Sequence, residues 1–569
     1  MPPSAVATPA AALDALIAEY YRVWFRFHPE TAVDLGVPGY AGLLRPYDDD
    51  DVGALAALHE KVLAGLEALD PAALDDPDRA IDARLLAGQA LIEHHELLER
   101  DWRRRDPQRY LPVNAIHQLT ILPVDDFAAA FAARVGQVPV YLRGARAHLL
   151  DMPELVPPVW LESALASAAA GADYLRGLDR HPRVLRHFPR GQIHEALERA
   201  ARAVQDYGHF LEAEIGPRAQ GEFACGREQF ERLLARRHGL SIDADRLHAF
   251  GVRLFDQTRR ELEAVARELR TDGDQQALWR QICAEHAEPA ALLDDYRRQM
   301  RAARAFVAER DLVTLPARER LDVVETPPFL RHQIPFAAYM PPTPDDPEQQ
   351  GYYYVTPPVD AAALSEHNYP GLMHTCVHEA WPGHHLQFVT ANLSPAGRSL
   401  PRLVNTSVTL YEGWALYCEQ LMQEQGFLGR PEQRFILLRD RLWRALRVQL
   451  DVELQTRGLG VEAAADRMQN ALGFPRAQAL ADLRWYTRSP AVPMGYAAGW
   501  ALLNAARTRL VPAHMPLKNF HDGLLGAGSI GLPWVLRRVF GADLCRAAEA
   551  DVFDEAKDMI SATEPRGRR

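Results

Sequence analysis

Residues 378–385 read HEAWPGHH, which nearly spells the zinc-peptidase motif H-E-x-x-H, but Pro382 stands where the second histidine belongs. In H-E-x-x-H, one helix face presents both histidines to the metal and the glutamate lies beside the metal-bound water. On a straight helix here, His384 would lie off the face of His378, and His385 would lie roughly 10 Å farther along the axis. Proline and glycine favour a kink or bulge, so we expect Pro382-Gly383 to break the helix and return a histidine to the ion.

Two other interpretations remain open for this stretch. His374 and His378 are spaced i, i+4, the better pair for a straight helix, but no glutamate lies between them as in H-E-x-x-H. A histidine-rich helix end can also be a simple C-terminal cap, because protonated histidine is favoured there.

A third metal ligand is expected from the segment NTSVTLYEGWALYCEQLMQE, residues 405–424. It predicts an amphipathic helix with Glu412 and Glu419 on one face. Glu412 lies among apolar neighbours, where an unpaired carboxylate is costly to bury and a cation would relieve that cost. In the alternative interpretation, Glu412 is exposed to solvent on the helix surface, which is the more common position of a single glutamate.

The spacing of apolar residues and of prolines along the chain predicts a mainly α-helical protein with one small β element. Residues 10–310 repeat apolar residues at three- and four-residue steps, and helices resume after Pro370-Gly371. Between them lies a proline-dense stretch in which GYYYVTPP, residues 351–358, predicts a short strand suited to a sheet edge. We place an N-terminal helical region at 1–215 and a catalytic region at 216–569, as parts of one continuous fold.

Composition excludes several classes of function. A net charge of −12 argues against nucleic-acid binding, which needs a concentrated excess of Lys and Arg. No stretch approaches the ~20 apolar residues of a membrane helix. The five cysteines form no C-x-x-C pair, and the N-terminus lacks a basic start followed by an apolar run. We therefore expect free thiols, no signal peptide and a cytoplasmic location, with an oligomeric state that the sequence does not disclose.

The stretch HEAWPGHHLQ resembles the HEAxPGHHxQ signature of the bacterial domain of unknown function family 885. Further segments resemble motifs of the same family in order along the chain: FRFHPETAVDLGV, QGYYYVTPP, YEGWALYCE, YTRSPAVPMGYAAG and FHDGLLGAGSIGLPWVL. That family is similar to the gluzincin metallopeptidases, which bind zinc through two histidines on one helix and a glutamate on the next. The resemblance implies a gluzincin-like (zincin-like) architecture with the small β element next to the active-site helix.

The resemblance also implies roles for single residues. His378, His384 and Glu412 become zinc ligands, with His385 in reserve, and Glu379 becomes the general base. Glu419 becomes a partner that orients a ligand histidine, whereas His374 has no counterpart in the motif.

Three further residues are expected to contact substrate. Tyr496 would donate a hydrogen bond to the oxyanion, and Arg488 would pair with a substrate carboxylate. Tyr354 lies on the strand that we expect to align an extended peptide by edge pairing. Pro493 departs from the family pattern after Pro490 and puts the local backbone in question.

The sequence therefore predicts one Zn²⁺, or another divalent metal, in a chamber between the two helical regions. The expected activity is hydrolysis of peptide or peptide-like amide bonds in small substrates by a glutamate-activated water. Two alternatives remain: a lyase or amide-forming enzyme acting on a small metabolite, and a non-catalytic binding protein that retains a relic site.

Overall fold

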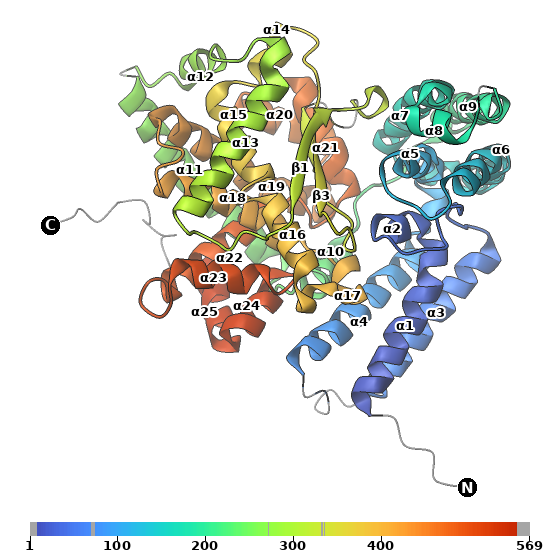
Figure 1. Ribbon diagram of the computed structural model, residues 1–569, viewed down its shortest axis with the longest axis horizontal. Helices are drawn as coiled ribbons and strands as arrows, with labels where there is room; N and C mark the ends of the chain where they lie inside the picture. Colours follow the sequence, from blue (N-terminus) through green and yellow to red (C-terminus); the bar gives the residue numbers. More distant parts are fainter. Residues whose placement is uncertain are drawn as a thin grey trace.

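The computed structural model describes residues 8–69, 74, 76–189, 191–270, 272–331, 334 and 336–554. Helices dominate this part of the chain, as predicted, and a single three-stranded sheet accompanies them within the described residues (Figure 1). None of the described helices is both long and apolar enough to cross a bilayer. Residues 1–7 of the N-terminal segment discussed above lie outside the described ranges.

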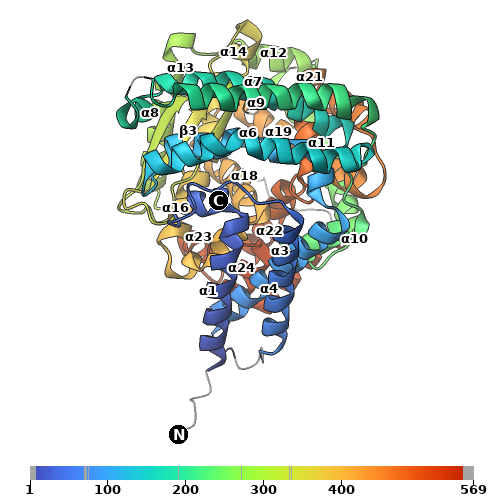
Figure 2. The ribbon, with the colours of Figure 1, turned by 90° about the vertical axis from the view of Figure 1, so that its right-hand side faces the viewer.

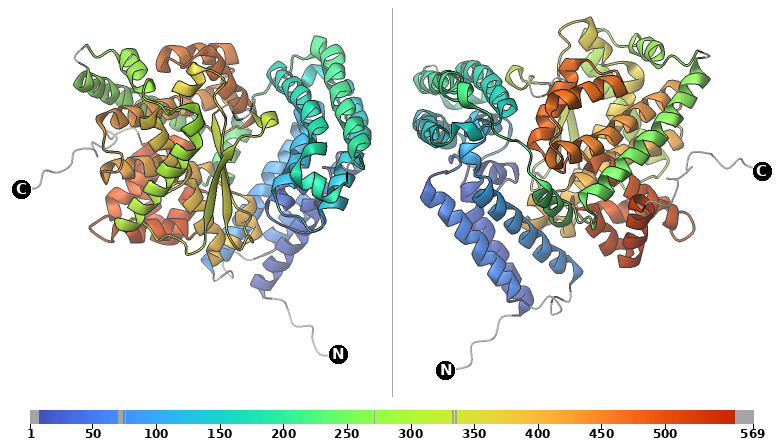
Figure 3. Two further views of the ribbon diagram at one scale, coloured as in Figure 1. Left: turned by 45° about the horizontal axis from the view of Figure 1, so that its top comes forward. Right: turned by 180° about the vertical axis from the view of Figure 1, so that it is seen from behind.

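The N-terminal helices lie along one side of the molecule (Figures 1 and 3). They are α1 (Pro9–Phe27), α2 (Pro29–Asp34), α3 (Asp49–Glu67), α4 (Pro77–Glu99), α5 (Val113–Ile121), α6 (Phe127–Asp151), α7 (Pro158–Gly177), α8 (Pro182–His187) and α9 (His194–Phe210). Viewed from that side, α6, α7 and α9 run across the rest of the molecule (Figure 2). Prolines begin α7 and α8, as their fixed φ and missing N–H favour.

The remaining helices surround the sheet and the histidine motif. They are α10 (Arg227–Arg236), α11 (Ala244–Leu269), α12 (Gln275–Cys283), α13 (Leu292–Glu309), α14 (Ala361–Ser365), α15 (Tyr369–Glu379), α16 (His384–Leu393), α17 (Leu400–Val404), α18 (Val408–Glu424), α19 (Pro431–Thr456), α20 (Val461–Leu472), α21 (Arg476–Arg488), α22 (Gly495–Leu510), α23 (Leu517–Leu525), α24 (Leu532–Phe540) and α25 (Ala542–Phe553).

The buried apolar side chains form separate clusters. One cluster consists of residues between Val33 and Ile215, and the largest unites the sheet with α10, α11, α13, α15, α18, α19 and α22–α25. Helix α4 also contributes Ile81, Leu85 and Ile92 to this largest cluster, so the N-terminal helices share a core with the rest of the chain.

The sheet corrects the prediction of a single edge strand. Its order is β1-β3-β2, with β1 (Arg320–Glu325) parallel and β2 (Ala337–Met340) antiparallel to β3 (Gln350–Val355). The tyrosine-rich strand β3 is therefore central, with both of its hydrogen-bonding edges already used. Pro357 and Pro358 come after Val355, the last residue of β3. They therefore end the strand without interrupting its hydrogen bonds to β1 and β2.

The five cysteines are free thiols. Cys283, Cys376, Cys418 and Cys545 are buried, and Cys225 is half-buried.

Candidate metal centre

The helix break occurs where the sequence places proline and glycine. Helix α15 ends at Glu379 and α16 begins at His384. Within the break, the Gly383 N–H donates to the carbonyl of Val377 at 3.1 Å. A Cβ on residue 383 would lie 1.8 Å from the carbonyl oxygen of His378, so only glycine permits this close return of the chain.

The break brings two imidazoles and a carboxylate together. The Nε2 atoms of His378 and His384 lie 3.2 and 3.3 Å from the same Glu412 oxygen, and one ligand atom from each of the three residues lies within 4.8 Å of the others. Zinc bonds of about 2.0–2.1 Å in a tetrahedron would separate two ligand atoms by about 3.3 Å. The donor set and its spacing therefore fit a zinc ion.

Glu419 holds His378 in the orientation that such a site needs. The His378 Nδ1–H donates to Glu419 at 2.8 Å, which leaves Nε2 as the nitrogen facing Glu412. The other oxygen of Glu419 lies 3.3 Å from Nδ1 of His374, whose Nε2 lies 3.0 Å from the carbonyl of Gln433. His374 therefore contacts Glu419 on the side away from the metal ligands. Its i, i+4 spacing from His378 indicated in the sequence that the two histidines lie on the same helix face.

The charges of the centre favour a cation. Burial opposes ionisation of Glu412, but the neighbouring His384 and His378 hold its pKa well below the usual range. Burial lowers the pKa of His378, yet its hydrogen bonds to Glu412 and Glu419 outweigh this effect and raise the pKa to about 10. Glu379, Glu412 and Glu419 place three carboxylates around His378 and His384, with His374 behind Glu419, and a divalent ion would offset this negative charge.

His385, the reserve ligand, is engaged elsewhere. Its Nδ1 lies 3.0 Å from the Tyr339 hydroxyl, and its Nε2 lies 2.9 Å from Glu319. Glu319 also accepts a hydrogen bond from Arg304 at 2.7 Å. Gly351 on β3 makes room for this ring, because a Cβ there would lie 2.9 Å from Nδ1 of His385. The two ring nitrogens thus tie α16 to β2 and to the residue that precedes β1.

Glu379 and Tyr496 line the same cavity as the three clustered residues. Burial raises the pKa of Glu379, against the opposing effect of His378 and His384. Within the described part of the chain, no hydrogen bond to the Glu379 side chain is found, so its carboxylate is available to a water or a substrate. Burial, with a smaller effect of Glu412, raises the pKa of Tyr496 well above its usual value and keeps the phenol protonated.

Two glycines set the distance between the helices that carry Glu412 and Tyr496. A Cβ on Gly413 of α18 would lie 2.6 Å from the Cα of Gly499 on α22, and a Cβ on Gly499 would lie 2.0 Å from the Thr409 carbonyl oxygen. The two helices therefore touch through bare backbone.

The cavity occupies about 680 Å³ between the N-terminal helices and the clustered residues. Asp34 and Leu35, at the end of α2, and Leu122, after α5, form one side. The lining also includes β2 and the segment after it, Tyr411, and Arg444 and Arg447 of α19. A volume of this size suits a small substrate.

The structure does not bring Arg488 or Tyr354 to this cavity. Arg488 pairs with Asp106 at 2.5 Å, stacks over Trp160 at 5.1 Å and lines a different cavity. Tyr354 is buried in the central strand, opposite Val324 and Ala338. Neither belongs to the lining of the metal-centre cavity.

Comparison with solved structures places the fold among proteins of unknown function. Two chains, each called a putative lipoprotein, come from Shewanella oneidensis and Colwellia psychrerythraea. The first has 22% identity, covers 94% of this chain and 100% of its own, and has a TM-score of 0.74; the second has 18% identity, covers 97% and 100%, and has the same score. At these identities the likeness shows the fold alone.

A carboxypeptidase from Pyrococcus furiosus also aligns, with 13% identity over 95% of this chain and 99% of its own. Its TM-score of 0.36 is too low to bear on the fold or the activity. None of the curated proteins compared with the chain matches it.

A family model for bacterial proteins of unknown function, DUF885, matches residues 29–539. This match includes the histidine motif, the glutamate helix and the tyrosine segment. The chain therefore belongs to the DUF885 family.

Proposed function

We propose that this protein is a zinc-dependent hydrolase that cleaves peptide or peptide-like amide bonds in small substrates, with a gluzincin-like arrangement of its active site. The observation that carries the proposal is the convergence of His378, His384 and Glu412 on one point, with the Glu379 carboxylate in the same cavity. Another divalent ion that accepts imidazole and carboxylate ligands would serve the same chemistry.

In this proposal His378, His384 and Glu412 hold the ion, which when bound acidifies water and polarises a carbonyl group. Glu379 takes the proton from the attacking water and passes it to the leaving amine. Tyr496 donates a hydrogen bond to the oxygen on which negative charge develops. Glu419 keeps His378 oriented and itself makes no contact with substrate.

Strand β2 replaces β3 as the strand that would align an extended substrate. Residues Ala337–Met340 pair with β3 on one side and line the cavity. A peptide in the cavity would add to the remaining edge of β2. This assignment takes the place of Tyr354 as a substrate contact.

Arg444 and Arg447 give the same cavity a positive wall. They stack over Trp443 at 4.0 and 4.1 Å, and Arg447 lies 3.5 Å from Asp482. Arg444 has no hydrogen bond within the described residues, and its guanidinium lies 3.9 Å from the Asp440 carboxylate. We assign to this wall the pairing with a substrate carboxylate that the sequence suggested for Arg488.

Metal analysis and a peptide assay test the proposal together. Protein purified without chelator is expected to contain about one zinc ion per chain, and His378→Ala is expected to lose it. Glu379→Gln is expected to retain the metal but lose hydrolysis of a dipeptide panel, because its amide cannot accept the proton. Glu309→Gln, on the exposed end of α13, is the matched control. Cleavage that survives Glu379→Gln would contradict the mechanism.

A preference for substrates with a free carboxylate tests the positive wall. Peptides with a free C-terminal carboxylate are expected to have a lower KM than the same peptides with an amidated end, and Arg444→Gln is expected to remove the difference.

The cytoplasmic location predicted from the sequence remains a part of the proposal. Fractionation of cells that produce the protein would test it.

A further inference from the structure

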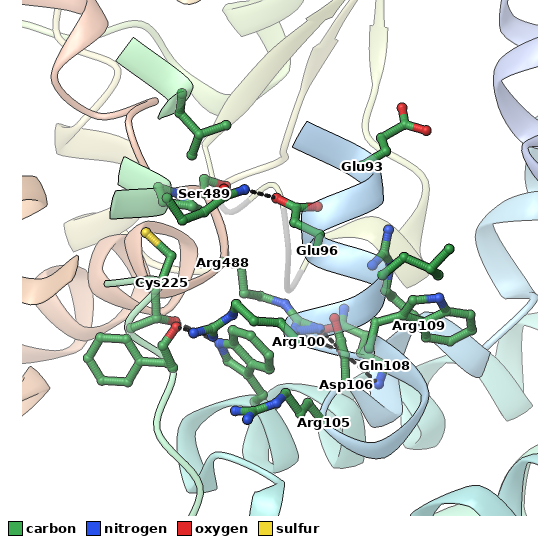
Figure 4. Close-up of a pocket in the computed structure, with 18 of the residues that line it drawn as sticks. Glu93, Glu96, Arg100, Arg105, Asp106, Gln108, Arg109, Cys225, Arg488 and Ser489 are labelled. Carbon is green, nitrogen blue, oxygen red and sulfur yellow. Dashed lines mark hydrogen bonds and ion pairs between the residues drawn. The ribbon is translucent and has the colours of Figure 1, made fainter. Parts of the chain in front are cut away.

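A second cavity, of about 590 Å³, is drawn in Figure 4, and among the described residues none lines both this cavity and that of the metal centre. It is formed by the C-terminal part of α4, the segment that follows it, residues 223–225, α10 and residues 487–492. Within the described part of the chain, six arginines line it: Arg45, Arg100, Arg105, Arg109, Arg237 and Arg488. Four of them are labelled in Figure 4, gathered near Asp106.

The charge of this cavity opposes that of the whole chain. Its lining holds six arginines against three carboxylates, Glu93, Glu96 and Asp106, an excess of three positive charges when all are ionised. The chain as a whole has a net charge of −12. A concentrated positive cavity in an acidic protein points to an anionic ligand.

The three carboxylates leave most of the arginines without a partner. Glu93 accepts hydrogen bonds from Trp24 at 2.7 Å and Gln89 at 3.0 Å, and Glu96 accepts one from Gln229 at 3.1 Å. Of the three, only Asp106 pairs with an arginine of the cavity, at 2.5 Å.

Among the described residues, the guanidinium groups of Arg45, Arg105 and Arg237, like that of the exposed Arg109, make no hydrogen bond or ion pair. Arg45, Arg105 and Arg237 are half-buried. Burial lowers the pKa of Arg45, and the neighbouring Arg109 lowers it further; burial and Arg100 do the same to Arg105. Arg109 therefore repels Arg45, and Arg100 repels Arg105, in a setting that water screens incompletely, and a bound anion would relieve the repulsion.

Other parts of the cavity are held in place by the fold. Arg100 donates to the carbonyls of Phe223, at 3.1 Å, and Ala224. Arg109 lies over the ring of Trp102 at 5.2 Å, and Arg488 over that of Trp160 at 5.1 Å. Fixed guanidinium groups suit carboxylates and phosphates, which they bind through paired N–H donors.

We propose that this arginine-lined cavity is a binding site for a small anion that carries at least two carboxylate or phosphate groups. The excess of three positive charges and the three half-buried guanidinium groups without a partner set the minimum charge of the ligand, and the volume limits its size. The ligand is either a separate small molecule or the acidic end of a substrate whose amide lies in the metal cavity.

The chain connects this site to the metal centre. Pro490 and Val492 line the arginine cavity, and Tyr496, a few residues on, lines the metal cavity. Between them, the N–H groups of Ala491 and Met494 donate to Asp451 at 3.2 and 3.1 Å, which fixes the segment. An anion bound at residues 487–492 therefore contacts the segment that positions Tyr496.

Calorimetric titration of metal-free protein with tricarballylate and with inorganic pyrophosphate, at constant ionic strength, tests the site. Saturable 1:1 binding of at least one of them is expected, with acetate binding at least tenfold more weakly. Arg105→Gln and Arg45→Gln are each expected to weaken binding at least tenfold. Arg104→Gln is the matched control, because Arg104 lies next to Arg105 but pairs with Asp151 at 3.0 Å and does not line the cavity.

Because metal-free protein is used, the result does not depend on the proposed hydrolase activity. Competition between the bound anion and a peptide ending in two glutamates assigns the site to the substrate's acidic end, and simultaneous binding of both assigns it to a separate ligand. Either result supports the proposal. Absence of saturable binding to the wild-type protein overturns it, as does equal affinity in folded wild-type, Arg105→Gln and Arg45→Gln proteins, with folding checked by circular dichroism.

Discussion

His521 should make the protein sensitive to mild acid. This side chain is fully buried in α23, where its Nδ1–H donates to the carbonyl of Leu312 at 2.7 Å and its Nε2 accepts from the Tyr417 hydroxyl at 2.9 Å. Burial lowers the pKa of His521 to about 4. Protonation of Nε2 would remove the acceptor that the hydroxyl of Tyr417 uses, and Tyr417 lies on α18 between Glu412 and Glu419.

The size of the effect follows from the difference in pKa between the folded and unfolded states. An unfolded histidine has a pKa of about 6.5, so between about pH 6.5 and 4 the unfolded chain binds more protons at this position than the folded one. Stability therefore falls as the pH falls through this window. Lowering the pH from 7 to 5 should cost about 2 kcal/mol through His521 alone.

Urea unfolding at pH 7 and pH 5, followed by tryptophan fluorescence, measures this contribution. Trp414 lies 5.3 Å from the His521 ring and reports on its surroundings. In His521→Gln, which cannot titrate, the loss of unfolding free energy between the two pH values should be smaller by about 2 kcal/mol. His514→Gln, at an exposed position, is the control. Equal losses in wild type and His521→Gln would refute the reasoning.

Three further changes test the metal centre and its supports. Glu419→Gln should lower zinc affinity about 10–100-fold in competition with a fluorescent chelator, because the orienting carboxylate is lost; unchanged affinity would count against its role. Gly383→Ala should lower both the melting temperature and the zinc content, since its Cβ would lie 1.8 Å from a carbonyl oxygen, whereas Gly136→Ala, in open space on α6, should do neither. Arg402→Met should destabilise the protein by about 3–5 kcal/mol in urea unfolding, because the fully buried guanidinium leaves Asp82, 2.8 Å away, without its partner; a loss below about 1 kcal/mol would show that the pair is dispensable.

Local patterns predicted the helices and the helix break well. Apolar periodicity, proline positions and the Pro382-Gly383 pair depend on a few neighbouring residues, and the structure ends α15 and restarts α16 around that pair. The spacing of Glu412 and Glu419 likewise predicted one helix, and both face the histidines. The choice between His384 and His385 could not be made, because it depends on the backbone angles within the break.

Pairings between distant segments could not be predicted. Strand β3 is central because β1 and β2 pair with it, and the hydrophobic pattern of a single strand does not reveal its neighbours. Arg488 binds Asp106 from the N-terminal helices, a contact across 382 positions that no local motif encodes. The arginine cavity was missed for the same reason, since its six arginines come from several distant segments.

The bare-backbone contact between Gly413 and Gly499 constrains how a protein of this kind can change. A single methyl group added at this crossing would meet main-chain atoms. The spacing between α18, which carries Glu412, and α22, which carries Tyr496, is therefore fixed. Differences in what the cavity accepts must then arise from other parts of its lining, where α2, β2 and the residue after α5 contribute side chains that can be exchanged without disturbing the contact between α18 and α22. Divergence within this fold would therefore change the side chains around the cavity and leave the placement of Glu412 and Tyr496 unchanged.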